Sequence, residues 1–191
     1  MKRQVIGLVG TPASGKGVIA EYLKDIGFVV YSLSDILRNR LKAEGIKPTR
    51  DNMIALGNEL RTKYGNDYLA ATLKKTIDKT DDKCIVIDSI RNPGEAQFLK
   101  ENLGAAIVTV TAPQKRSFEF MKKRNRQGDP KTWEEFTKVY DRELGIGQNE
   151  SGLRLKDCIE KADIVMKNTG TIEDLKEKIN NELHSRILKC R

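Results

Sequence analysis

The feature that most constrains this chain is the segment of residues 10–16, Gly-Thr-Pro-Ala-Ser-Gly-Lys, which fits the pattern G-x-x-x-x-G-K. It directly follows an apolar run, residues 4–9, and precedes a segment whose apolar residues have helical spacing. Phosphate oxygens need several N–H donors at close range, and glycine lets a backbone loop wrap around them. The sequence therefore predicts a strand, a phosphate-binding loop and a helix whose N-terminus adds positive charge.

We expect the whole loop to bind the phosphates of a nucleotide, and its Lys16 ammonium to contact the β- and γ-oxygens while charge moves during transfer. The hydroxyl residue that commonly follows this lysine, and that reaches Mg²⁺, is replaced by Gly17. The residues expected to hold the nucleotide are Gly10, Thr11, Pro12, Ala13, Ser14, Gly15, Lys16, Gly17 and Val18.

Five short runs rich in β-branched residues alternate with longer amphipathic segments, and this alternation predicts βαβ units. The fold class is therefore α/β, with a five-stranded parallel sheet and helices on both faces in three layers. We expect one domain over residues 1–191. Two connections, residues 33–80 and 112–162, are longer than a crossover helix requires, so we expect them to form excursions over the sheet. The predicted strands are residues 4–9, 28–32, 84–88, 105–111 and 163–167.

Composition narrows the function without deciding it. A net charge of +8 is compatible with polyanionic small molecules and with nucleic acid. Residues 113–126 are strongly basic, but they lack the interleaved aromatic residues of a single-strand binding surface, so we expect a solvated helix face. No apolar run approaches the roughly 20 residues that span a bilayer. The three cysteines are odd in number and lack zinc-ligand spacing. We expect a cytoplasmic protein with no membrane partner.

The loop, in which the lysine is followed by glycine, resembles that of the adenylate-kinase-like nucleoside monophosphate kinases, where it reads GKG. That family usually has threonine at the position of Val18. Residues 34–38, Ser-Asp-Ile-Leu-Arg, follow the second predicted strand and resemble the family's G-D-hydrophobic-hydrophobic-R segment. The resemblance implies that Asp35 and Arg38 bind the acceptor. Arg38 would hold its phosphate, because a planar guanidinium suits bidentate binding.

The end of the third predicted strand, residues 88–91, resembles a shortened form of the family's D-G-F-P-R segment. The resemblance implies that Asp88 orients Mg²⁺ through water and acts in catalysis. It implies that Arg91 clamps the transferring phosphate and contacts the acceptor.

Three arginines fall where the family carries arginines on a mobile lid, here about residues 124–147, and the family's acceptor-binding excursion matches about residues 33–80. The resemblance implies a catalytic role for Arg124 and contact with substrate for Arg126 and Arg142. Three aromatic residues in the same region have helical spacing and predict an apolar face of the lid itself, with a base-stacking site as the alternative. They are Trp133, Phe136 and Tyr140.

Nearly the whole chain also resembles a largely archaeal set of adenylate-kinase-related proteins, through residues 49–52, 129–136 and 141–144. This resemblance adds Arg50 as a secondary candidate beside Arg142. The predicted function is transfer of the γ-phosphoryl group of ATP, with Mg²⁺, to a small phosphate-bearing acceptor, most readily a nucleoside or deoxynucleoside monophosphate. Two alternatives stay open: a dephospho-coenzyme A kinase, and a nucleotide-dependent ATPase that acts on RNA or on a protein assembly.

Overall fold

The sheet is the centre of the molecule. The computed structural model describes residues 3–126 and 128–186. Five parallel strands lie in the order β2-β3-β1-β4-β5, and all five predicted strands are confirmed to within one residue at each end. Because the strands are parallel, their carboxyl ends meet at one edge of the sheet. The strands are β1 (Gln4–Gly10), β2 (Val29–Ser32), β3 (Cys84–Asp88), β4 (Ala106–Thr111) and β5 (Ile164–Lys167).

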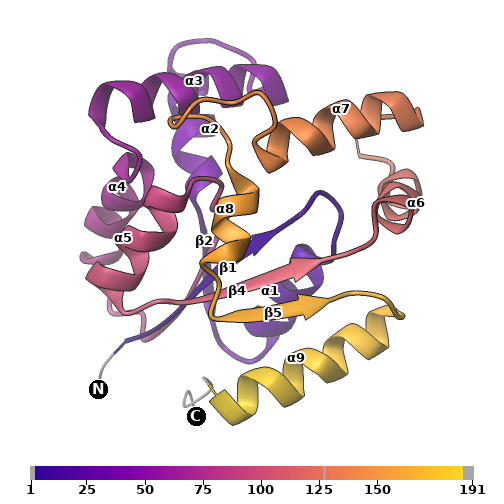
Figure 1. The fold of residues 1–191 in the computed structure, drawn as a ribbon. Helices are drawn as coiled ribbons and strands as arrows, with labels where there is room; N and C mark the ends of the chain where they lie inside the picture. The colour runs from indigo at the N-terminus through magenta and orange to yellow at the C-terminus, as the bar shows by residue number, and fades with distance from the viewer. Residues whose placement is uncertain (1–2, 127, 187–191) are drawn as a thin grey trace.

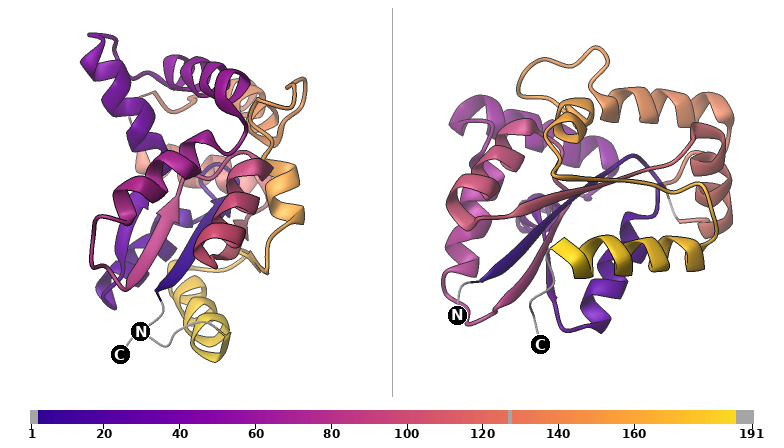
Figure 2. Two further views of the ribbon diagram at one scale, coloured as in Figure 1. Left: turned by 90° about the vertical axis from the view of Figure 1, so that its left-hand side faces the viewer. Right: turned by 60° about the horizontal axis from the view of Figure 1, so that its bottom comes forward.

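The side chains of β1 point alternately to the two faces of the sheet, and both faces are covered by helices. Val5 and Val9 belong to one buried apolar cluster, and Ile6 and Leu8 belong to another, because successive side chains of a strand point to opposite faces. A strand buried on both sides must be apolar throughout. The predicted three-layer α/β fold is therefore confirmed (Figures 1 and 2).

The helices divide between the two faces. One face is covered by α1 (Lys16–Asp25) and α9 (Ile172–Arg186). The other face carries the longer connections, and its helices are α2 (Leu33–Ala43), α3 (Arg50–Tyr64), α4 (Tyr68–Ile77), α5 (Pro93–Leu103) and α8 (Leu155–Glu160). Residues 33–80, predicted as an excursion, thus hold α2, α3 and α4.

The second long connection contains α6 (Gln114–Arg124) and α7 (Trp133–Leu144). A capping box of Thr132 and Glu135 begins α7. Phe136 and Tyr140 are buried with Met121 in a third apolar cluster, to which Ala13 of the phosphate loop also packs. Trp133 stacks on Phe136, with ring centroids 5.4 Å apart. Phe136 and Tyr140 therefore lie on an apolar face that rests against the loop, whereas Trp133 extends that face into solvent and is 39% exposed.

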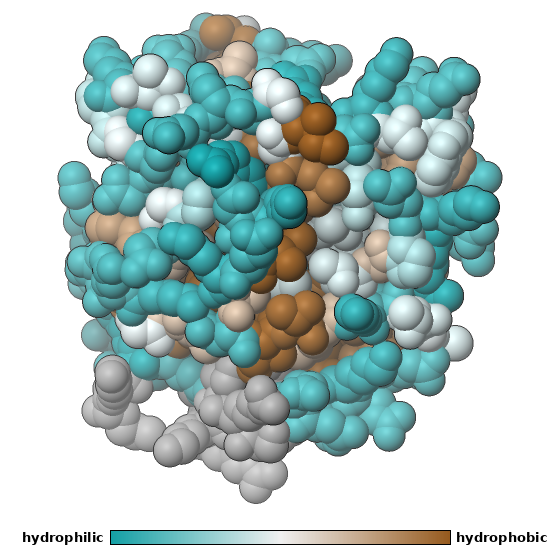
Figure 3. Space-filling view, viewed as in Figure 1, coloured by the Kyte–Doolittle hydropathy of each residue, from teal (hydrophilic) through white to brown (hydrophobic). Residues whose placement is uncertain are grey.

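Part of the surface is apolar. Figure 3 shows a band of hydrophobic residues down the middle of the face that carries α8 and β5, with hydrophilic residues on both sides. Val165 of β5 is exposed because β5 is an edge strand. In the part of the chain that the structure describes, no helix combines the length and the apolar character that crossing a membrane requires.

Candidate functional site

The phosphate loop is built from small residues because it is crowded. A Cβ atom at Gly10 would lie 2.5 Å from the carbonyl oxygen of Val110 and 2.8 Å from Cγ of Lys16. Gly15 precedes α1 with a φ of 111°, a conformation that glycine adopts without strain. At Gly17, by contrast, a Cβ atom would meet nothing within 4 Å. Gly10 and Gly15 are therefore required by the loop's shape, whereas Gly17 leaves open space at the helix N-terminus.

A segment far along the chain supports the loop. The side-chain amide of Asn168, just past β5, donates a hydrogen bond of 2.9 Å to the carbonyl oxygen of Ser14. Its backbone N–H donates to the carbonyl oxygen of Thr111. A Cβ atom at Gly15 would lie 2.7 Å from Cδ2 of Leu175 in α9. The loop therefore lies against residues that the sequence analysis did not connect with it.

Lys16 is the first residue of α1, is half-buried, and has a pKa below its usual range. Burial is the largest cause, since it disfavours the charged ammonium. The positive charges of Arg91 and Arg124 lower the pKa of Lys16 further, whereas the negative charges of Asp88 and Glu143 raise it. The four residues expected to be catalytic, Lys16, Asp88, Arg91 and Arg124, therefore share one electrostatic environment, together with Glu143.

Asp88 ends β3 beside the loop. Within the described residues, its Oδ1 atom is buried and has no hydrogen-bond partner, and the Oγ atom of Ser14 is in the same condition. The side chain of Val18 packs into the apolar cluster beneath the sheet and offers no hydroxyl. No group of three or more acidic, histidine or cysteine side chains in the described chain could hold a metal ion. The donors present thus fit an Mg²⁺ ion held mostly by phosphate and water, with Asp88 as a partner.

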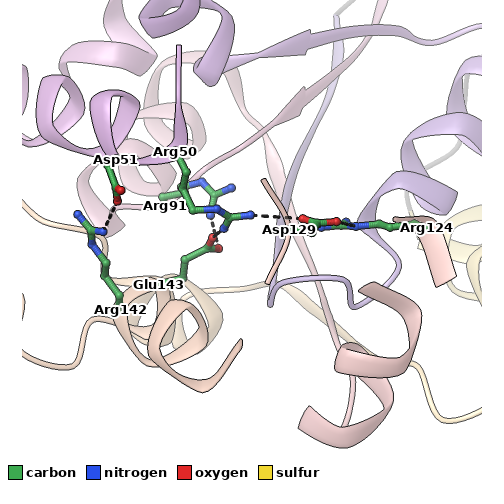
Figure 4. A network of polar contacts seen from close by, with 7 residues as sticks. All are labelled: Arg50, Asp51, Arg91, Arg124, Asp129, Arg142 and Glu143. Carbon is green, nitrogen blue, oxygen red and sulfur yellow. Dashed lines mark hydrogen bonds and ion pairs between the residues drawn. The ribbon is translucent and has the colours of Figure 1, made fainter. Parts of the chain in front are cut away.

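Figure 4 shows a network of arginines and carboxylates. Three of its members, Arg91, Arg124 and Glu143, influence the pKa of Lys16. The centre of the network is Glu143, a buried residue of α7 that accepts hydrogen bonds from Arg91 and, at 2.5 Å, from Arg50. Burial raises the pKa of Glu143, but Arg91, Arg50 and Lys16 together outweigh it and leave the pKa lowered. The pKa of Arg91 is raised, chiefly by Glu143.

Asp129 is the second carboxylate of this network. It accepts two hydrogen bonds from Arg124, at 2.7 and 2.8 Å, and lies 3.7 Å from Arg50. Arg142 pairs with Asp51 at 2.7 Å on the outer side. Arg50 and Asp51 belong to α3, whereas their partners belong to α7 and to the turn before it. Ion pairs therefore join two excursions that are distant in the sequence.

A cavity of about 410 Å³ lies between α3 and α7. Its wall carries cations, carboxylates and a few apolar side chains, so that it can meet both charged and uncharged parts of a small molecule. The lining residues are Arg50, Asp51, Ile54, Gly128, Asp129, Pro130, Lys131, Glu135, Val139, Arg142 and Glu143.

The structure does not bring every predicted residue into this network. Asp35 and Arg38 pair with each other on the exposed side of α2. Arg126 is exposed, and its carbonyl oxygen accepts a hydrogen bond from the N–H of Asp129. Among the described residues, neither Arg38 nor Arg126 pairs with Glu143 or Asp129. Glu143 itself was missed, because an acidic residue within a helix gives no local signal of its partners.

Comparison with known proteins supports the reading of the loop. A sequence model of a family described as an AAA domain, AAA_17, matches residues 9–137. The chain is 32% identical to a UPF0200 protein of Hyperthermus butylicus, over 90% of this chain and 89% of that protein. It is 33% identical to a UPF0200 protein of Staphylothermus marinus, over 91% and 88%.

Solved structures share the fold. TT1252 from Thermus thermophilus superposes with a TM-score of 0.63 at 19% identity, and the match covers 98% of this chain and 100% of that one. A shikimate kinase from Acinetobacter baumannii, in complex with shikimate, gives a TM-score of 0.60 at 17% identity, covering 98% and 96%. At these identities the likeness shows the fold, which is that of a P-loop kinase.

Proposed function

The chain belongs to the AAA_17 family of P-loop domains and to the UPF0200 proteins, and from this premise we propose that it is an ATP-dependent phosphotransferase. The γ-phosphoryl group of ATP would pass to a small phosphate-bearing acceptor, most readily a nucleoside or deoxynucleoside monophosphate. In-line transfer needs little covalent chemistry from the protein, so positioned positive charge is the main requirement.

One observation carries this proposal: Lys16, where the phosphate loop enters α1, lies close enough to Arg91, Arg124 and the carboxylate of Asp88 for their charges to influence its pKa. A site that only bound nucleotide would need the loop and its lysine. Two further arginines whose charges reach the same lysine suit charge that spreads over a transferring phosphoryl group. Asp88, with a buried and unpaired oxygen among the described residues, suits water-mediated contact with Mg²⁺.

Residues 124–147 are proposed as a lid that excludes water, the competing acceptor. Arg142 and Arg126 belong to this segment.

Residues 33–80 are proposed as the acceptor-binding excursion, with Asp35 and Arg38 on α2. The acceptor panel below includes shikimate and a simple sugar, because solved structures with this fold are described as shikimate and sugar kinases.

The experiment is a coupled ADP-release assay with Mg-ATP. Each reaction contains one acceptor from a panel of ribo- and deoxynucleoside monophosphates, dephospho-coenzyme A, shikimate, a sugar, or none. Stimulation by one acceptor, with the phosphorylated product identified by mass, supports the proposal and names the substrate. Hydrolysis that no acceptor changes contradicts it and favours an ATPase that acts on RNA or on a protein assembly.

Lys16→Ala tests the loop directly. The substitution removes the cation expected on the β- and γ-oxygens, so we expect kcat to fall by about a hundredfold or more in the same assay. Lys24→Ala is the matched control, because Lys24 is an exposed lysine of the same helix, α1, and its loss should leave turnover within about twofold. Full turnover in a folded Lys16→Ala variant would overturn the assignment.

A further inference from the structure

We propose that Glu143 is a positioning residue, a built-in anion that holds Arg91 and Arg50 in place and gives them up when a phosphate group binds. The inference deepens the proposed function and rests on it for the rate of transfer, but not for nucleotide binding. Glu143 lies in residues 141–144, one of the segments that carry the family resemblance, but no role was expected of it.

The first step is the burial of Glu143. Its side chain is 5% exposed, and a carboxylate so far from water is tolerated only when it is paired and hydrogen-bonded. Each of its two oxygens has its own arginine: Oε1 faces Arg50 and Oε2 faces Arg91. One carboxylate therefore sets the direction of both guanidiniums.

The second step is the position of these arginines. Arg50 and Arg91 are 35% and 28% exposed, so that neither guanidinium is sealed from a ligand, and Arg50 also lines the cavity. Both Arg91 and Glu143 are close enough to Lys16 to influence its pKa. A phosphate that contacts Lys16 therefore approaches cations that Glu143 already neutralises.

The third step is the competition that follows. Two anions that share the same cations repel each other, so a bound phosphate and the Glu143 carboxylate cannot both form a full ion pair with Arg91. The carboxylate thus lowers phosphate affinity while it keeps the arginines aligned. Removing its charge should tighten phosphate binding and slow transfer, and loss of a purely structural ion pair would not produce these opposite effects.

The variant Glu143→Gln removes the charge and keeps the shape. We expect a non-hydrolysable ATP analogue with Mg²⁺, titrated by calorimetry, to bind about fivefold to tenfold more tightly. The reason is that the two arginines, no longer paired with a carboxylate, can form charge-assisted hydrogen bonds to phosphate. We expect kcat to fall by about tenfold or more, because the arginines lose alignment. Unchanged or weaker analogue binding by folded Glu143→Gln overturns the proposal.

Two further variants keep the test sharp. Glu143→Asp retains the repelling charge but is too short to hold both arginines, so analogue affinity should rise by no more than about twofold while kcat falls. An unchanged kcat in this variant would count against positioning, even if Glu143→Gln does not fold. Glu95→Gln is the comparison for burial alone, because Glu95 is buried beside Arg61 and its hydrogen bond to Arg91 is with the backbone N–H, not with the guanidinium. It should lower the melting temperature without tightening binding.

Failure of this inference is distinguishable from failure of the proposed function. If an acceptor is phosphorylated but Glu143→Gln binds the analogue no more tightly, the inference alone is wrong. If Glu143→Gln tightens binding and no acceptor is phosphorylated, competition between Glu143 and phosphate stands without the kinase assignment.

Discussion

Two buried carboxylates in this molecule pair with arginines, in very different surroundings. Glu95 of α5 is fully buried, and Arg61 of α3, which is 2% exposed, donates two hydrogen bonds to it at 2.9 and 2.8 Å. Glu143 of α7 is nearly as buried, but its arginines are about one third exposed and it lines a cavity. The first pair is sealed in the core and the second is open to a ligand.

The difference shows how the chain holds Arg91 from two sides. The second oxygen of Glu95 accepts the backbone N–H of Arg91 at 2.8 Å and that of Asn92 at 3.1 Å. Glu143 holds the side chain of the same arginine. The sealed carboxylate therefore fixes the backbone from which Arg91 extends, and the open carboxylate directs its guanidinium. Only the second contact can be exchanged for a phosphate.

The largest expected effect comes from breaking the sealed pair. Arg61→Ala leaves the charge of Glu95 buried without a cation, which costs about 3–5 kcal/mol of unfolding free energy. Arg50→Ala, which breaks the open pair, should cost only about 1 kcal/mol, because Arg50 is partly solvated and Arg91 remains with Glu143. Urea unfolding of both variants measures the two values. Equal losses of unfolding free energy would show that the core pair and the cavity pair contribute equally to stability.

A smaller effect is expected from acid. The pKa of Glu143 is lowered from 4.5 in the folded protein, so its contribution to stability is present above this value and is lost as the pH falls through the folded pKa. When the pH is lowered from about 6.5 to below the folded pKa of Glu143, the melting temperature of the wild type should therefore fall further than that of Glu143→Gln. Thermal melts across this range test it. Parallel curves for the two proteins would mean that Glu143 titrates no differently when folded.

The smallest effect is expected at the outermost ion pair. Asp51 is 81% exposed where it meets Arg142, so Asp51→Asn should change the unfolding free energy by less than about 0.5 kcal/mol. The same variant should remove part of any salt dependence of thermal melting, because exposed pairs are screened by salt. A loss of unfolding free energy as large as that of Arg61→Ala would contradict the expectation that an exposed pair contributes little to stability.

The strands and the phosphate loop were predictable because their signals are local. Buried parallel strands are continuous apolar runs, and the loop depends on glycines and a lysine within eight consecutive residues, 10–17. The positions of Lys16, Asp88 and Arg91 follow from the ends of neighbouring strands. For the same reason, the apolar face of α7 was readable from helical spacing.

The ion-pair network was not predictable. Glu143 meets Arg50 and Arg91 from 93 and 52 positions away, and such pairing depends on how the excursions cross. The roles of Arg38 and Arg126 were expected from short motifs, which do not say which way an exposed side chain points. Those two roles stay predictions, and the acceptor assay with Arg38→Ala would measure the first through its KM.

The contact between Asn168 and Ser14 has a consequence for how the protein is made. The phosphate loop is made before the amide that braces it and the leucine that packs on Gly15, both of which come more than 150 residues later in the chain. The strand that carries the loop also needs β4 to complete its pairing. Nascent chains that lack β5, Asn168 and α9 should therefore fail to retain nucleotide, so that this ability arrives only after those residues have been made.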